Sequence, residues 1–448
     1  MAALAARKQR VVSSHVLRRG RQPLLSIVKR VAPVLCAALF ALPSALFAQS
    51  GAETIKYDGF VHDDAGTMYG TIALTVKMAL NSGIPNWTFT GKAVMQDKTI
   101  NFTAKDTGMK TSFEFFAKTG EIISLTLESD TFFGTIYSSD SFLNISGARA
   151  VFADKNDPEA QARLEKVRGQ YNMALIDVVG GEMQGYVTLN IGNLGKVKIT
   201  GSLSDGTKVS SSAALLEGVE VNGWHCIALH CPLYSKKGFI SGLLWLNPKD
   251  KVISVGVYNG WFVDWVSNDP MKGPAKPLAL DVVGGYFGDG KVGPTIAPGL
   301  LFDVDIAVVN LPSPAPNLVT GAKNPYGWVI DALPLGIPVN ISGGKLVLPK
   351  ATKPKINSDP PDVVYWFDGE NPCGATLTHT PKTGVFKGKF NLYYQGMNPA
   401  RGANWETKII SMSYSGVLVP YDGQIIGLGT GTATIGQQKV GLPVYLWR

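Results

Sequence analysis

The chain has 448 residues, enough for two or three domains with sizeable cores, and a formal net charge of +8. All of this excess charge lies in residues 1–48, which contain eight Lys or Arg residues and no acidic residue. The other 400 or so residues carry 34 basic and 34 acidic side chains. A neutral chain has no overall field to steer it towards polyanions, so the composition excludes a generally basic, nucleic-acid-binding protein.

Residues 1–48 have the order of a secretory signal peptide, with basic residues followed by an apolar stretch over 31–48. An uncleaved membrane anchor is the alternative. The apolar stretch is only long enough to reach the lower limit for spanning a bilayer, and Pro33 and Pro43 interrupt it. We therefore expect export to a secreted, periplasmic or cell-surface location, with no transmembrane span after cleavage.

Three cysteines follow the leader, namely Cys226, Cys231 and Cys373. An odd number of cysteines in an exported chain argues against a disulfide framework. One disulfide that involves Cys373 stays open as an alternative.

A period of two dominates the rest of the chain, where apolar residues alternate with small polar ones. The clearest runs are 70–76, 87–90, 99–103, 186–191 and 196–200. The pattern predicts an all-β protein of two or three antiparallel β-sandwich or small-barrel modules, with one short helix and a Pro/Gly-rich connector. A single outer-membrane barrel is disfavoured because its strands need about 9–11 alternating residues.

One helix of about 11 residues is predicted after Asp157, which is placed as the N-cap with Pro158 at the first helical position. Gly169 is expected to end it. Its expected apolar stripe consists of Ala160, Ala162, Leu164 and Val167.

Fifteen of the 27 prolines lie between Pro270 and Pro361. Since proline cannot donate a hydrogen bond to a sheet, this region is expected to form edge strands and ordered loops. The predicted organisation is a signal peptide (1–48), a first β module (49–155), a helical boundary (156–169), a second β module (170–266), the proline-rich connector (267–361) and a third β module (362–448).

A short glycine pattern occurs in Lys237–Leu244 and again in Thr383–Phe390. The first glycine suits a turn, and the second permits a bulge or the close approach of a neighbouring strand. Such a unit must stack on a copy of itself to bury its apolar face.

The segments 370–374 and 377–390 resemble a recurring C-terminal module of large secreted proteins from bacteria of the Verrucomicrobia and Lentisphaerae type. The segments 171–175, 185–189 and 201–210 resemble its companion repeat. The resemblance implies a repetitive, secreted β protein, and it supplies no catalytic positions.

Four residues that can bind metals lie within a seven-residue segment, namely His225, Cys226, His230 and Cys231. In a strand, however, His225 and Cys231 face one way while the other two face the opposite way. Two of them completed by Cys373 or His379 would be needed for one ion. The favoured interpretation is that they are ordinary strand residues, with no metal and no cofactor.

Acidic residues form two patterns that bear on function. Asp154, Asn156, Asp157 and Glu159 suggest a calcium loop with Glu165 at its twelfth position, but the sixth position lacks the required glycine. Capping of the predicted helix explains these acids more simply. Carboxylate pairs for glycoside hydrolysis are conceivable at Asp303/Asp305 and Asp362/Asp368.

Aromatic residues offer a binding hypothesis. Trp261, Trp265 and Trp366, with Tyr258 and Tyr365, lie near predicted loops, where exposed rings could hold sugars. The alternative is that these rings fill a core.

No nucleophile or nucleotide motif occurs in its required context, so an enzyme is not expected. The leading hypothesis is an exported, non-catalytic β-repeat protein with a structural or binding role. The alternatives are a carbohydrate-binding protein and a carbohydrate-active hydrolase. The expected partners are polysaccharides or envelope components, not nucleic acid.

Overall fold

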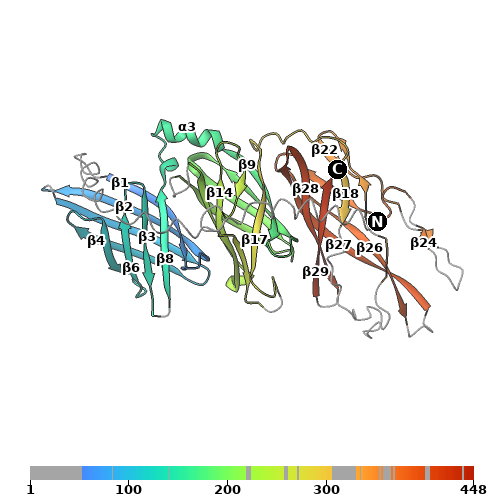
Figure 1. The fold of residues 1–448 in the computed structure, drawn as a ribbon, viewed down its shortest axis with the longest axis horizontal. Helices are drawn as coiled ribbons and strands as arrows, with labels where there is room; N and C mark the ends of the chain where they lie inside the picture. The colour runs from blue at the N-terminus through green and yellow to red at the C-terminus, as the bar shows by residue number, and fades with distance from the viewer. Residues whose placement is uncertain are drawn as a thin grey trace, which may run out of the picture.

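In the computed structural model, three antiparallel sheets follow one another along the chain and lie side by side along the long axis of the molecule (Figure 1). The structure describes residues 53–448 except 83, 140, 218–222, 257–260, 270–271, 305–328, 333, 353–354, 357–364, 367–368, 399–403 and 436–437. The predicted signal peptide lies outside these residues. The all-β prediction is confirmed. No helix in the described part of the chain is long and apolar enough to cross a membrane.

The first module is an eight-stranded sheet whose strands lie in the order β4-β3-β2-β1-β8-β7-β6-β5. Its strands are β1 (Glu53–His62), β2 (Met68–Asn81), β3 (Ile84–Met95), β4 (Thr99–Thr107), β5 (Ser112–Phe116), β6 (Ile122–Leu127), β7 (Thr131–Tyr137) and β8 (Phe142–Arg149). Alternate residues bury one face of this sheet in a core that includes Phe89, Phe113 and Phe132. Edge and tilted ring contacts, such as Phe89 on Phe113 at 4.6 Å between centroids, fill that core.

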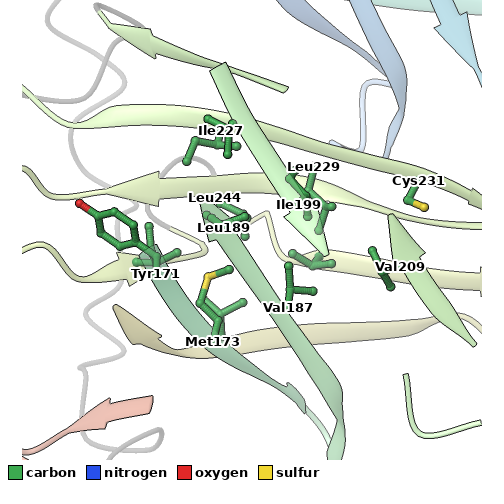
Figure 2. Packing of buried hydrophobic residues seen from close by; sticks show 14 of the residues in the cluster. Tyr171, Met173, Val187, Leu189, Ile199, Val209, Ile227, Leu229, Cys231 and Leu244 are labelled. Carbon is green, nitrogen blue, oxygen red and sulfur yellow. The ribbon is translucent and has the colours of Figure 1, made fainter. Parts of the chain in front are cut away.

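The second module is a closed ring of eight antiparallel strands, because its last strand pairs with its first. Its strands are β9 (Gly169–Asp177), β10 (Met183–Ile191), β11 (Lys196–Leu203), β12 (Lys208–Glu217), β13 (His225–Leu233), β14 (Gly238–Leu246), β15 (Ile253–Ser254), β16 (Val263–Ser267) and β17 (Leu278–Gly288). β15 and β16 pair with successive parts of β14, so together they form one interrupted barrel strand. Aliphatic side chains such as Val187, Leu189 and Leu244 fill the interior (Figure 2), as expected for a barrel of this size.

Helix α3 (Pro158–Val167) packs against this barrel core through Ala160, Leu164 and Val167. The predicted N-cap is confirmed, since the Asp157 carboxylate accepts a hydrogen bond from the Ala160 amide at 2.9 Å. Two details differ from prediction. Ala162 is exposed, and Arg168, in an extended conformation, ends the helix in place of a glycine turn, so Gly169 begins β9.

The predicted boundary at residue 266 is wrong, because the middle sheet continues to the end of β17. This strand lies between β9 and β16 and is therefore central, not at an edge. The eleven residues Leu278–Gly288 contain no proline, so all their amide groups remain available for sheet hydrogen bonds.

The third module is a sheet in the order β19-β26-β27-β28-β29-β18-β20, with β25 also paired to β26. Its strands are β18 (Leu301–Val304), β19 (Val329–Ala332), β20 (Ile337–Pro338), β25 (Thr376–Thr380), β26 (Val385–Asn398), β27 (Asn404–Tyr421), β28 (Gln424–Ile435) and β29 (Gln438–Trp447). Two small ribbons join β21 (Asn340–Ser342) to β22 (Lys345–Val347) and β23 (Lys355–Ile356) to β24 (Tyr365–Trp366).

The glycine pattern positions these strands as predicted at three of its four glycines. A Cβ on Gly242 would lie 2.8 Å from the carbonyl oxygen of Phe262. A Cβ on Gly388 would overlap the carbonyl oxygen of Thr376. Gly384 has a φ of 68°. Gly238 differs because it already belongs to β14, and the preceding Tyr234–Lys236 segment supplies the positive-φ turn.

Both faces of the barrel wall are buried where neighbouring modules pack on it. β13 and β14 place Cys226, Ala228 and Trp245 outwards against Phe60 and Met68 of the first module. On another side of the barrel, Ala174, Met183 and Tyr186 pack against Val417 and Val419 of β27. The barrel is therefore the central body to which both flanking sheets attach.

One buried amide connects the barrel to the third module. Asn172 on β9 is fully buried, and its Nδ2 donates hydrogen bonds to the carbonyl oxygens of Thr383 at 2.9 Å and Leu418 at 2.8 Å. Its Oδ1 accepts a hydrogen bond from Gln170. Gly384 makes room for this arrangement, because a Cβ there would lie 2.6 Å from the Asn172 amide.

Substitution Asn172→Ala should therefore destabilise the protein by about 2–4 kcal/mol, because two buried carbonyl groups lose their donor. The loss is measured as the free energy of unfolding in urea. Asn101→Ala, at an exposed position of strand β4 in the first module, should change it by less than about 0.5 kcal/mol. Equal effects of the two substitutions would contradict a special role for Asn172.

Candidate binding groove between the barrel and the third sheet

The structure separates Trp261 from Trp265, two of the three tryptophans proposed to hold sugars. Trp265 lies inside the barrel with 2% of its surface exposed, and its Nε1 donates a hydrogen bond to the Tyr234 hydroxyl at 3.0 Å. Trp261 precedes β16 and instead packs outside the barrel against His62, at 4.9 Å between ring centroids. The side chain of Trp366 lies outside the described residues. The platform prediction is therefore wrong for Trp265, because Val263 and Trp265 share the inward face of β16.

The His–Cys strand β13 divides its four side chains between two environments, as strand alternation predicts. Cys231 belongs to the barrel core, whereas Cys226 belongs to the contact with the first module. Cys226, Cys231 and Cys373 are buried and form no disulfide. Burial raises the pKa of the Cys373 thiol to about 12 and lowers that of His230 to about 4. Within the described residues, no three His, Cys, Asp or Glu side chains are grouped to hold a metal ion.

The acidic candidates have structural partners where the structure describes them. Asp303 is 5% exposed and accepts hydrogen bonds from the Gly336 amide and the Trp447 indole. Asp305, Asp362 and Asp368 lie outside the described residues. In the candidate calcium loop, the Asp154 carboxylate accepts a hydrogen bond from the Asn156 amide, Asp157 caps α3, and Glu165 pairs with Arg168 at 2.9 Å.

A groove of about 490 Å³ lies between the barrel and the third sheet. One wall comes from the β11–β12 hairpin, and the other comes from β25, β26, β27 and β28. The lining consists of Ser202, Leu203, Gly206, Lys208, Thr376, Thr378, Lys387, Gly388, Lys389, Ser413, Tyr414, Ser415, Thr430 and Thr432. It contains seven Ser or Thr and three Lys, with no carboxylate, imidazole or thiol.

Strand register arranges the sheet wall as two rows of the same chemistry. In the first row, Thr376 pairs with Lys389, Lys389 with Ser413, and Ser413 with Thr432. In the second row, the same pairings join Thr378, Lys387, Ser415 and Thr430. Residues two apart on a strand share a face and lie about 7 Å apart. Each row therefore presents threonine, lysine, serine and threonine side by side on the same face of the sheet.

The next row on the same face is apolar and explains why a groove forms. Val385 pairs with Val417, and Val417 with Leu428. These side chains pack against Tyr186 and its neighbours on the barrel. The sheet thus contacts the barrel along its apolar rows. The contact reaches the edge of the second polar row, where Ser415 hydrogen-bonds to Tyr186 and Thr430 is 3% exposed, and the groove opens beside it.

The floor of the groove depends on Gly388. A Cβ on Gly388 would lie on the inner face of the sheet, 2.7 Å from the Tyr414 hydroxyl. That hydroxyl donates a hydrogen bond to the Thr376 carbonyl at 2.6 Å. Burial raises the pKa of Tyr414, so the phenol stays protonated as a donor. The bond attaches the edge strand β25 to β27 across β26.

Lysines on both walls make the groove electropositive. Lys387 and Lys389 are exposed on β26. Lys208, on the barrel wall, is oriented by a hydrogen bond from its Nζ to the Ser202 hydroxyl at 3.2 Å. This site was not predicted from the sequence, although four polar pairs with a spacing of two are present on the four strands.

Two carboxylates, those of Asp63 and Asp264, lie close together where the first module meets the barrel. Burial, reinforced by the Asp63 carboxylate, raises the pKa of Asp264 on β16 to about 6. Asp63 itself accepts hydrogen bonds from the Thr67 amide and the Tyr69 hydroxyl. These contacts hold Asp63 in place facing the barrel, which keeps the two carboxylates near each other.

Substitution Gly388→Ala should destabilise the protein by about 1–3 kcal/mol, because a methyl group would overlap the Thr376 carbonyl and displace β25. Thermal unfolding measures the loss. Gly192→Ala serves as the control, since a Cβ at Gly192 would be 3.6 Å from its nearest neighbour. A Gly388→Ala protein as stable as this control would contradict the described floor.

Substitution Asp264→Asn should make the free energy of unfolding less dependent on pH. The raised pKa means that the folded state favours the protonated carboxyl, so this stabilisation is full below about pH 4 and is lost as pH rises to about 6. After allowance for partial exposure, the variant should gain about 1 kcal/mol at pH 7 and little at pH 4. The exposed Asp97→Asn provides the comparison, and an equal gain at both pH values would contradict the assignment.

No known protein family matches the chain, and no curated protein matches its sequence. Similar solved structures include a protein of unknown function from the DUF3598 family of Nostoc punctiforme, with 10% identity, 53% of this chain and 95% of that chain covered, and a TM-score of 0.18. They also include the isotype 1 transferrin binding protein B of serogroup B Neisseria meningitidis. The match has 11% identity, covers 89% of this chain and 77% of that chain, and has a TM-score of 0.20. A porin-like protein from Bacteroides uniformis matches with 10% identity and a TM-score of 0.11, and the match covers 89% of this chain and 97% of that chain. TM-scores this small carry no argument about function.

Proposed function

We propose that this chain is an exported, non-catalytic β protein that binds a polysaccharide, and that the groove between the barrel and the third sheet is its binding site. The observation that carries the proposal is the pair of Thr–Lys–Ser–Thr rows on the groove wall. Hydroxyl and ammonium groups bond readily to sugar oxygens. Their repetition along the strands suits a ligand that itself repeats.

The composition of the groove supports binding without turnover. Glycoside hydrolysis needs an acid and a base or nucleophile at the scissile bond, and the lining of the groove supplies neither. Asp303, the described member of the acid pair at 303/305, is buried and hydrogen-bonded within the third module. The predicted signal peptide supports export.

Blocking the groove tests the proposal. Residues 49–448 are titrated by calorimetry against dextran, xylan, alginate and polygalacturonate, while reducing-end release is measured in the same samples. We expect at least one polysaccharide to bind and none to be cleaved. Ser413→Trp should reduce the affinity at least about tenfold, because the indole fills the space a ligand needs.

Ser411→Trp is the matched control. Ser411 lies two residues away on the same face of β27 and does not line the groove. It should leave the affinity unchanged. The proposal fails if no polysaccharide binds, if Ser413→Trp binds as the unsubstituted protein does, or if sugar is released.

A further inference from the structure

Resting on the proposed function, we propose further that the groove is specific for acidic polysaccharides, with carboxylate or sulfate groups held by Lys387 and Lys389 on one wall and Lys208 on the other. The lining contains these three cations and no anion. An acidic ligand therefore meets lysines on both walls and no carboxylate in the lining. The nearby Asp205 carboxylate, on the turn before Lys208, accepts hydrogen bonds from the Thr207 and Tyr234 hydroxyls. A neutral sugar would use only the hydroxyl groups.

The arrangement of the lysines favours a polymer over a small anion. Lys387 and Lys389 extend from the same face of β26 at positions about 7 Å apart. Lys208 belongs to the opposite wall, where its Nζ donates a hydrogen bond to the Ser202 hydroxyl. The three positions are distributed along and across the groove, so they match several separate charges better than one phosphate or carboxylate ion.

The other lining residues favour a sugar over a nucleic acid. Single-stranded nucleic acids are held largely by stacking of bases on aromatic rings. Tyr414 is the one aromatic residue of the lining, and it is 3% exposed, with its hydroxyl bonded to Thr376. Arginine, the preferred residue for bidentate phosphate recognition, is absent from the lining.

The hydroxyl groups complete the match to a polysaccharide. Each row places a serine and two threonines beside its lysine. A hydroxyl group both donates and accepts, and therefore pairs with a sugar hydroxyl in either orientation. An acidic sugar presents such hydroxyls on every residue together with its charge.

Dextran and carboxymethyl-dextran of equal length test this specificity, because they share a backbone and differ in charge. We expect carboxymethyl-dextran to bind at least about tenfold more tightly at low ionic strength, with the advantage lost near 0.5 M salt. Lys387→Gln combined with Lys389→Gln should reduce its affinity about tenfold. The arginine pair at the same positions should retain it.

Lys105→Gln combined with Lys345→Gln is the matched control, because both lysines are exposed on strands outside the groove. It should bind as the unsubstituted protein does, and thermal unfolding verifies that all variants are folded. Equal binding of the two dextrans, with the glutamine pair unaffected, would overturn the charge specificity. The proposed function would survive that result if Ser413→Trp still blocked binding.

Single-stranded DNA of matched charge is the final comparison. Tighter binding of DNA than of carboxymethyl-dextran, abolished by Ser413→Trp, would overturn the assignment to polysaccharide. Failure of every polysaccharide to bind would instead remove the proposed function itself. The two proposals therefore fail on different results.

Discussion

The contact between the outer wall of the barrel and its two neighbours determines the arrangement of the whole molecule. A small barrel can bury its interior alone, yet β9, β13 and β14 are buried on both faces. Their outward residues need a partner, and the flanking sheets provide it. At the third module this contact is fixed by the Asn172 amide, which bonds to the backbone of the β25–β26 turn at Thr383 and of β27 at Leu418.

The groove follows from the same contact. One face of β26, β27 and β28 is apolar where it meets the barrel and polar in the next two rows. The change occurs between Val385 and Lys387, Val417 and Ser415, and Leu428 and Thr430. Because strand register aligns this change across all three strands, the apolar surface that packs on the barrel gives way to a polar one along a single row of paired residues.

Sequence patterning predicted the strands, the helix cap and the opposite orientations of Cys226 and Cys231, because each depends on local geometry. It did not predict the closure of the barrel, since β9 and β17 lie about 100 residues apart. Nor could it show that Asn172 is buried, because an outward polar residue on a strand is normally solvated. Trp261 and Trp265 are four residues apart and would share a face if one strand contained both. Because β16 begins only at Val263, this alternation does not include Trp261.

The groove was hidden in the sequence for a similar reason. Each of its polar pairs, such as Lys387 and Lys389, is ordinary for the exposed face of a strand. Only the register of four strands places these pairs in rows, and only the barrel gives them an opposite wall. The near-zero charge expected after signal cleavage also conceals a local excess of lysine, so an overall charge balance says little about one site.

The most direct test of this account is lysine footprinting with an acetylating reagent, read by mass spectrometry, in the presence and absence of carboxymethyl-dextran. We expect Lys208, Lys387 and Lys389 to become protected together, while Lys105 and Lys345 react as before. Protection that spreads evenly over all exposed lysines, or that occurs only outside the groove, would contradict it.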